Sequence, residues 1–273
     1  MNTKLPLFIL IVLAIFSCKN KIENKATDST VNEDEHEIVH QKEHKHWTYE
    51  GETGPEHWIE IEKESDCDGK RQSPINIIDV NAIDEASLKP IDIHYSANVK
   101  IHEITNNGHS IQYNFEKGDF IILNDNEYRL KQIHFHEPSE HTINGIRYPL
   151  EMHLVHVSKD NKIVVLAIMA QEGESSEPFT FLEKFLPINT GTTKLIDTDF
   201  DLNQNLPKDM GYYTYSGSLT TPPCTQNVTW FVFKTPITIS LDQVKQLQKL
   251  MPLNNYRDEQ PINGRTIKQY TSR

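Results

Sequence analysis

Gln132-Ile133-His134-Phe135-His136 is the stretch of this sequence that decides the fold, because apolar and polar side chains alternate along it. Alternate side chains of a β-strand point to the same face of a sheet. Gln132, His134 and His136 therefore share one face, whereas Ile133 and Phe135 point into a hydrophobic core on the other. The pattern predicts a strand that separates a core from a polar site carrying two imidazoles.

A second stretch, Glu151-Met152-His153-Leu154-Val155-His156-Val157, follows the same rule. It places Glu151, His153 and Val155 on one face and sends His156 to the other. If this strand pairs antiparallel with the first, His153 completes a cluster of three histidines. Three neutral imidazoles with an open fourth position are typical ligands of a catalytic zinc. The alternative is that two histidines share a strand by chance, in a chain that contains 13 of them.

The remaining sequence predicts one domain that is mainly β with a few short helices. Apolar or alternating stretches predict strands over residues 91–95, 110–115, 120–123, 131–136, 152–157, 163–170 and 228–233. Helices are expected over 178–186 and 241–250, the second with Ser240 as N-cap and Gln243 completing a capping box. Because no repeat or Gly/Ser-rich linker interrupts the later sequence, we expect a single domain over residues 46–273.

Composition excludes several classes of protein. The 39 acidic and 27 basic side chains among 273 residues give a formal charge of −12, which opposes nonspecific binding of nucleic acid. The three cysteines, Cys18, Cys67 and Cys224, form no CxxC pair, so a structural cysteine-zinc module is excluded as well. Neither composition nor pattern decides between a monomer and a homodimer.

The first 17 residues have the pattern of a secretory signal peptide. Lys4 precedes an apolar run from Leu5 to Phe16, and Ser17 and Cys18 follow. This run is shorter than the roughly 20 residues that a membrane-spanning helix needs. Ile15-Phe16-Ser17-Cys18 also resembles a bacterial lipobox, so we expect an exported lipoprotein, periplasmic or at the cell surface, attached to a membrane through acylated Cys18. The alternative is an ordinary signal peptide cleaved near Ser17.

Residues 18–45 combine this attachment site with a polar segment that we expect to be a disordered tether. The segment is rich in charge and almost free of aromatic residues, so it buries too little apolar area to offset its ordering entropy. His36, His40 and His44 recur at intervals of four residues, and a helix would bring them together as metal ligands. The alternative is a solvated linker that happens to contain histidines.

Seven stretches, in this order along residues 46–270, resemble the alpha class of carbonic anhydrases. They are Gly54-Pro55-Glu56-His57-Trp58, Gln72-Ser73-Pro74-Ile75-Asn76-Ile77, Asn107-Gly108-His109-Ser110, His134-Phe135-His136, Ser139-Glu140-His141-Thr142, Glu151-Met152-His153-Leu154-Val155-His156 and Tyr215-Ser216-Gly217-Ser218-Leu219-Thr220-Thr221-Pro222-Pro223-Cys224. The resemblance implies a central, mostly antiparallel, twisted sheet of about ten strands with a metal at the bottom of a conical cleft.

The resemblance also implies reversible hydration of CO₂ to bicarbonate and a proton. In the family, Zn²⁺ lowers the pKa of its bound water to about 7 and so provides the hydroxide that attacks CO₂. The positions that match its ligands are His134, His136 and His153, and Gln132 and Glu151 match the residues that accept the imidazole N–H groups. Hydrolysis of activated esters is a plausible side activity of the same site.

Four further groups of residues take roles from the resemblance. Thr220 and Glu140 match the pair that orients the attacking oxygen, and His109 matches the proton shuttle, an imidazole expected to titrate near pH 6.5. Tyr49 and Gln112 match residues that order water between the metal and the shuttle. The substrate pocket and its apolar wall correspond to Val155, Val165, Leu219, Thr221, Val228 and Trp230.

Cys67 and Cys224 match a disulfide found in bacterial and secreted members of the family. Such a bond spans 157 residues (224 − 67) and lies close to Thr220, so it would brace the active-site loop. One departure from the animal pattern is the short connection of Glu137, Pro138 and Ser139 between His136 and Glu140.

Two other functions fit parts of the sequence. A family-like domain that has lost zinc can serve as a binding module, but all three ligand histidines are present here. A surface protein that scavenges zinc is suggested by the histidines of the tether. Removing residues 19–45 discriminates between the enzyme and the scavenger, because only the scavenger would lose most of its metal capacity.

Overall fold

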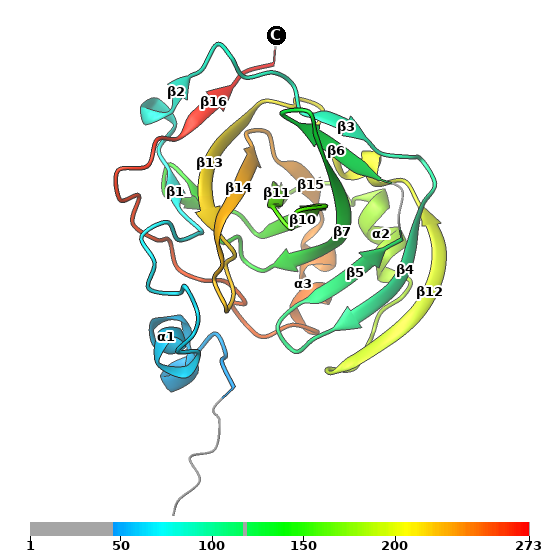
Figure 1. The fold of residues 1–273 in the computed structure, drawn as a ribbon. Helices are drawn as coiled ribbons and strands as arrows, with labels where there is room; N and C mark the ends of the chain where they lie inside the picture. Colours follow the sequence, from blue (N-terminus) through cyan, green and yellow to red (C-terminus); the bar gives the residue numbers. More distant parts are fainter. Residues whose placement is uncertain (1–45, 117–118, 273) are drawn as a thin grey trace, which may run out of the picture. The chain divides into compact units, whose positions relative to one another are not determined.

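The computed structural model describes residues 46–116 and 119–272 (Figure 1). The predictions for the signal peptide, Cys18 and the tether histidines His36, His40 and His44 lie outside these residues. Within these ranges the chain forms one compact unit.

A large twisted sheet dominates the described part of the chain (Figure 1). Ten strands follow one another in the order β12-β4-β5-β7-β10-β11-β14-β13-β16-β2, while β3, β6 and β15 join beside this path. Most neighbours are antiparallel, as predicted, but β11 runs parallel to both β14 and β15, and β16 runs parallel to β2. The sheet is therefore mixed.

The strands of this sheet have the following bounds. They are β2 (Ile83–Asp84), β3 (Asp92–His94), β4 (Val99–Asn106), β5 (Ile111–Phe115), β6 (Phe120–Leu123), β7 (Asn126–His136), β10 (Leu150–Ser158), β11 (Ile163–Glu172), β12 (Thr192–Phe200), β13 (Tyr212–Ser218), β14 (Gln226–Phe233), β15 (Ile237–Ile239) and β16 (Lys268–Tyr270). A small second sheet contains β1 (Asn76–Ile77), β8 (Thr142–Ile143) and β9 (Ile146–Arg147). All seven predicted strands overlap an observed strand.

Helices are few and short. The α-helices are α1 (Trp58–Ile61), α2 (Glu177–Glu183) and α3 (Leu241–Gln248), and the 3₁₀ turns are Gly51–Thr53, Pro55–His57, Asp79–Asn81 and Leu202–Asn205. Both predicted helices are confirmed. Ser240 accepts a hydrogen bond from the backbone N–H of Gln243, whose side chain returns to the Ser240 backbone, so the predicted capping box is present.

The two faces of the central strands bury different side chains. One face carries the larger hydrophobic core, in which Ile133 and Phe135 of β7 pack with Leu154 of β10 and with residues of α2 and α3. The opposite face holds the histidines and a second apolar cluster built around Trp230 of β14. The alternation in 132–136 therefore predicted both the strand and its orientation.

Candidate active site

Three histidines meet on the polar face of β7 and β10. The two strands are antiparallel, and His153 lies directly opposite His134 in the register. The ring centroids of His134 and His136 are 5.0 Å apart, and those of His153 lie 5.0 Å and 4.7 Å from them. Two adjacent strands at the middle of the sheet thus create the cluster that the alternation predicted.

Each of these rings uses one nitrogen to contact an oxygen that can only accept a hydrogen bond. Because carboxylate, amide and backbone carbonyl oxygens carry no hydrogen, the contacting nitrogen must carry it. The three contacts are His134 Nδ1 to Gln132 Oε1 at 2.9 Å, His136 Nδ1 to the Asn255 carbonyl at 2.6 Å, and His153 Nε2 to Glu151 Oε1 at 2.7 Å.

The remaining nitrogens consequently present lone pairs, and they converge. Ligand atoms of the three rings lie within 4.8 Å of one another, and His134 Nε2 is 3.2 Å from His153 Nδ1. His136 Nε2 is buried and has no hydrogen-bond partner among the described residues. Facing lone pairs repel one another unless a cation lies between them. The donor set therefore fits a metal ion with three nitrogen ligands.

Burial keeps these imidazoles in the neutral form that binds a metal. It lowers the pKa of His136 to about 4, and it lowers the pKa of His134 well below its ordinary value, with His153 and His136 adding to the effect. The pKa of His153 is also lowered by burial, against the opposing influence of Glu151. Neutral rings are consequently favoured over protonated ones at physiological pH.

Glu151 holds His153 of the cluster in place through hydrogen bonds. Its Oε1 accepts hydrogen bonds from His153 and from His141 Nδ1, both at 2.7 Å, and its Oε2 accepts from the backbone N–H groups of Glu140 and His141, both at 2.8 Å. Burial alone would raise the pKa of Glu151, but His141 and His153 outweigh it and hold the pKa well below the ordinary value. Glu151 is therefore an ionised carboxylate with fixed partners.

Glu140 is a second buried carboxyl group, and its environment differs. Its Oε1 accepts from the Arg257 backbone N–H at 3.0 Å, and its Oε2 lies 3.4 Å from His136 Nε2. Burial raises the pKa of Glu140 to about 7, although His153 and hydrogen bonds from the Thr220 side chain and the Arg257 backbone act in the opposite direction. Thr220, which the resemblance pairs with Glu140, is therefore among the groups that act on its pKa.

A cavity of about 120 Å³ opens beside the histidines. Three residues selected from the sequence for the water path or the pocket line it together with the predicted shuttle residue His109 and two of the metal-site histidines, and Gln132 lines it as well. The lining consists of Trp47, Tyr49, Asn107, His109, Ser110, Gln112, Gln132, His134, His136 and Thr221. The Tyr49 hydroxyl is buried and has no partner among the described residues, so it is free to bind water.

His109 lies at this cavity between two aromatic neighbours. Its ring stacks on Trp47, with centroids 3.6 Å apart, and its Nε2 lies 3.0 Å from His46 Nε2. Burial and, to a smaller extent, His46 lower the pKa of His109 from 6.5 to about 4. The sequence-based expectation of titration near pH 6.5 is therefore wrong for this arrangement, because the sequence does not reveal that His46 and Trp47 cover the ring.

The predicted apolar wall forms one cluster beside His153. Trp230 is buried, and its ring centroid is 4.9 Å from that of His153. Its indole N–H donates to the Ser218 carbonyl at 3.0 Å, which leaves the ring faces for apolar contacts. The other wall residues selected from the sequence belong to the same cluster or pack against it: Val155, Val165, Leu219 and Val228.

Comparisons with known proteins agree with this geometry. A sequence model of the family described as eukaryotic-type carbonic anhydrase matches residues 53–271. The chain belongs to this family. A carbonic anhydrase of Klebsiella pneumoniae is 40% identical over 226 residues, which cover 81% of this chain and 90% of the relative. A carbonic anhydrase of Neisseria gonorrhoeae is 37% identical over 82% of this chain and 88% of its own.

Solved structures similar to this chain have the same fold. The alpha-carbonic anhydrase of Thermovibrio ammonificans, in complex with the inhibitor sulfanilamide, has a TM-score of 0.78 and 38% identity, covering 82% of this chain and 98% of its own. Dioscorin complexed with ascorbate has a TM-score of 0.77 and 32% identity, covering 84% of this chain and 99% of its own. Family and fold together support an enzyme that hydrates CO₂.

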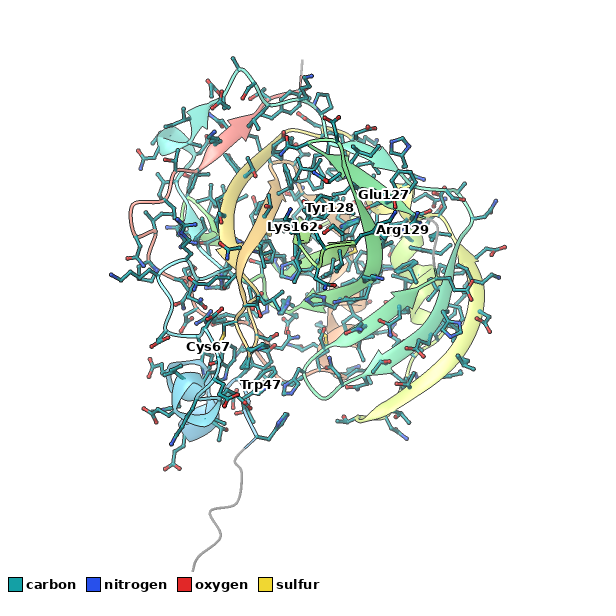
Figure 2. All side chains as sticks on the ribbon, viewed as in Figure 1. Trp47, Cys67, Glu127, Tyr128, Arg129 and Lys162 are labelled. Carbon is teal, nitrogen blue, oxygen red and sulfur yellow. A yellow bond between two sulfur atoms is a disulfide. The ribbon has the colours of Figure 1, made fainter. Side chains whose placement is uncertain are left out.

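The disulfide that the carbonic anhydrase resemblance implied is present. Cys67 and Cys224 are bonded, with Cα atoms 4.9 Å apart, and they pack in a small cluster with Tyr49 and Trp58. Trp47 packs against this cluster, and Figure 2 labels both Trp47 and Cys67. The bond thus joins the N-terminal segment at the cavity to the loop that carries Thr220. No helix in the described part of the chain is long and apolar enough to cross a bilayer.

Several residues of this carbonic anhydrase site have no role that the sequence predicted. Asn255 accepts from His136, and Tyr215 contacts His141 Nε2 through its hydroxyl at 2.6 Å. Arg257, although buried, donates to the backbone carbonyls of Ser73 and Cys67. Asn255 and Arg257 lie more than a hundred residues from their partners, so no local sequence pattern predicts these contacts. Tyr215 occurs in a family stretch, which was its only signal.

Proposed function

We propose that the chain hydrates CO₂ reversibly to bicarbonate and a proton, with Zn²⁺ held by His134, His136 and His153. The observation that carries the proposal is the convergence of three imidazole lone pairs, each fixed by an acceptor on the opposite nitrogen of its ring. Bound there, Zn²⁺ would supply a Lewis acid that activates water near neutral pH.

Thr220 and Glu140 are the residues that orient the attacking oxygen in this proposal. If the Thr220 hydroxyl donates its hydrogen to the Glu140 carboxylate, the Thr220 oxygen can only accept a hydrogen bond from the water beside it. That water then directs its lone pair away from Thr220 and toward the substrate. Arg257 keeps Glu140 in place through its backbone N–H.

Apolar side chains bind the substrate in this proposal. CO₂ carries neither charge nor dipole, so a wall made by Val155, Val165 and Trp230 offers contact without competing hydrogen bonds. Leu219 and Val228 extend the wall, and Thr221 lines the cavity. Hydrolysis of small activated esters is a side reaction in this proposal, because a planar carbonyl compound can approach the same activated water.

His109 is the group that we propose to carry the proton out. It lines the same cavity as His134 and His136, and the Tyr49 hydroxyl and the Gln112 amide lie along the route. Tyr49 offers an unpartnered hydroxyl that can hold a water molecule in the chain. His46, which lies 3.0 Å from His109 and is exposed, provides a neighbouring group toward solvent.

Export and membrane attachment form a separate part of the proposal. The apolar run Leu5 to Phe16 and the lipobox-like ending at Cys18 support secretion followed by acylation, and the Cys67–Cys224 disulfide is typical of an oxidising compartment. Metabolic labelling with a radioactive fatty acid tests it. Label on the parent chain and none on Cys18→Ser is expected, whereas equal labelling would contradict acylation at Cys18.

Stopped-flow hydration of CO₂, measured together with the zinc content of the full chain, tests the enzymatic proposal. One tightly held zinc per chain and rapid hydration are expected. The two alternatives predict different results. A binding module that has lost zinc shows neither stoichiometric zinc nor hydration, and a zinc scavenger loses most of its metal capacity when residues 19–45 are removed.

A further inference from the structure

A second cavity, of about 450 Å³, lies apart from the active site and shares no lining residue with it. It forms where the segment after α1 meets β13 and the segment that precedes β16 (Figure 1). The Asn263 side chain holds two of these segments together by donating to the Lys70 carbonyl at 2.9 Å. Beside Gly264 and Asn263, the lining comprises Lys70, Arg71, Arg265, Ser216 and Thr266.

The charge of this cavity is opposite to that of the chain. Three of its lining residues, Lys70, Arg71 and Arg265, are cations and none is acidic, although the whole chain has a formal charge of −12. Across residues 46–116 and 119–272, none of the three forms an ion pair with a carboxylate within 4.0 Å. The cavity therefore carries positive charge that the described residues leave without a counter-ion.

Arg265 is held in position without being neutralised. Its guanidinium donates to three backbone carbonyls, those of Ile262 at 2.9 Å, Ser216 at 3.2 Å and Pro261 at 2.8 Å. Carbonyl oxygens orient the group but supply no net negative charge. A guanidinium has five N–H groups, so each terminal nitrogen keeps one for another partner.

Arg71 adds a second guanidinium, which is close enough to interact electrostatically with Arg265. Burial lowers the pKa of Arg265, and the charge of Arg71 lowers it further. The Arg71 backbone N–H is bound to Gln226 Oε1 at 2.9 Å, whereas its side chain is exposed. Two like charges that lie together without a carboxylate create a potential that favours an anion.

We infer that this cavity binds a phosphate group, either as the free ion or as the headgroup of a phospholipid. Two guanidinium groups and one ammonium match the charge of a phosphate dianion better than that of a monovalent anion. The Ser216 and Thr266 hydroxyls are additional donors to oxygens that have several lone pairs. The cavity is large enough for a phosphate group with its substituent.

Calorimetric titration of the full chain with inorganic phosphate at low ionic strength tests the inference. The parent should bind phosphate, and Arg71→Gln should weaken the binding by about tenfold, which corresponds to the loss of one charge-assisted contact. Arg129→Gln is the matched control. Arg129 lies on β7 (labelled in Figure 2), is paired with Glu127 and lines neither cavity, so this variant makes the same change in net charge and should bind like the parent.

Vesicles of phosphatidylglycerol distinguish the two sources of phosphate. If Arg71→Gln weakens co-sedimentation with the vesicles but not the calorimetric binding of phosphate, the ligand is the headgroup. If Arg71→Gln weakens the calorimetric binding of phosphate, the ligand is the free ion. Anion binding at the histidine cluster is common to all variants and cancels in the comparison. Equal binding of both probes by the parent and Arg71→Gln, or no binding of either by the parent, would overturn the inference. Circular dichroism confirms that each variant is folded, and Lys70→Gln repeats the test from a neighbouring position.

Discussion

His153 and His156 lie three residues apart on β10, and both are buried and have lowered pKa values, yet their environments differ. On the hydrophobic face, His156 uses both nitrogens: Nδ1 contacts the Leu154 carbonyl at 3.0 Å and Nε2 contacts the Tyr95 hydroxyl at 2.7 Å. On the polar face, His153 binds Glu151 through Nε2 and directs Nδ1 toward His134.

The comparison shows that burial and residue type do not identify a metal ligand. Both rings are inaccessible to solvent, and burial is the main cause of both pKa shifts. The partner of the second nitrogen makes the difference. A hydroxyl, which can donate or accept, satisfies His156 within the protein, whereas His153 faces another imidazole lone pair, an arrangement that a bound cation would stabilise.

Replacing each of these histidines by alanine tests the comparison with the largest expected effect. His153→Ala should abolish both stoichiometric zinc and CO₂ hydration, because two imidazoles do not hold the ion as three do. His156→Ala should retain zinc in whatever fraction of the protein is folded. Full zinc occupancy in His153→Ala would contradict the assignment and move the third ligand to His141 or His156. Metal analysis and stopped-flow kinetics provide the readouts.

Reduction of the Cys67–Cys224 bond tests whether zinc binding by the three histidines depends on the loop that this disulfide braces. The disulfide joins residues that are 157 positions apart in the sequence. Removing such a constraint should lower the free energy of unfolding by about 2–4 kcal/mol. The melting temperature should fall, while zinc remains bound to the folded protein, since all three ligands lie on β7 and β10. An unchanged melting temperature, or two free thiols in exported material, would refute the structural role.

Glu151→Gln weakens the partner of His153 without touching the ligand itself. The amide has one carbonyl oxygen in place of two acceptor oxygens, and it cannot satisfy His141, His153 and two backbone N–H groups together. We expect zinc affinity to fall by about 10- to 100-fold, as for other outer partners of metal-bound histidines. Competition with a chelator measures this change. Parent-like affinity would show that Glu151 only supports the fold.

His156→Leu tests the role of His156, the histidine on the hydrophobic face, through the free energy of unfolding. Tyr95 loses its partner, so the free energy of unfolding should decrease by about 1–3 kcal/mol at pH 7 while zinc affinity stays constant. Tyr95→Phe removes the same bond from its other end and is the matched control. If zinc affinity fell as much as stability, the two faces of β10 would not be independent.

The acid sensitivity of the same variant gives a second readout. Burial lowers the pKa of His156 to about 3 from its ordinary 6.5, so between these values the unfolded chain binds a proton that the folded chain does not. Stability contributed by the neutral ring is present above pH 6.5 and decreases as the pH falls through this window. His156→Leu should make the decrease shallower in urea unfolding at pH 7 and pH 5, and an unchanged slope would contradict the shifted pKa.

The smallest effects are expected at His109, which lines the cavity. His109→Ala should slow hydration in weak buffer and regain rate when a small imidazole-type buffer is added, because only proton removal is affected. Loss that no buffer restores would mark His109 as structural, and parent-like activity in weak buffer would remove it from the mechanism.

His46→Ala refines this result. It should raise the pKa of His109 only part of the way toward 6.5, because burial is the larger cause of the shift and remains. A nuclear magnetic resonance titration of the His109 ring measures the change. An unchanged pKa would show that His46 does not act on His109.

Local patterns revealed the parts of this fold and site that depend on neighbouring residues. Alternation placed His134, His136 and His153 on one face, and a four-residue signature located the cap of α3 at Ser240. The edge strand β12 went unpredicted, because its exposed side chains show little of the apolar pattern that marks a buried strand.

Contacts between distant segments left no comparable signal. Asn255 meets His136 across 119 residues, and His46 and Trp47 cover His109 from the beginning of the domain. The lowered pKa of His109 follows from these contacts, so no reading of the residues around it could have given the value. Sequence pattern therefore located the three histidines of the cluster. The residues that orient their rings or shift the pKa of His109 could be identified only from the three-dimensional structure.

The most direct test of the three-histidine centre is X-ray absorption at the zinc edge of the purified full chain, with hydration measured on the same sample before and after chelation. One zinc per chain with three nitrogen neighbours, and hydration that disappears on chelation and returns with added zinc, is the predicted result. Rapid hydration by metal-free protein, or a bound zinc without three nitrogen ligands, would contradict it.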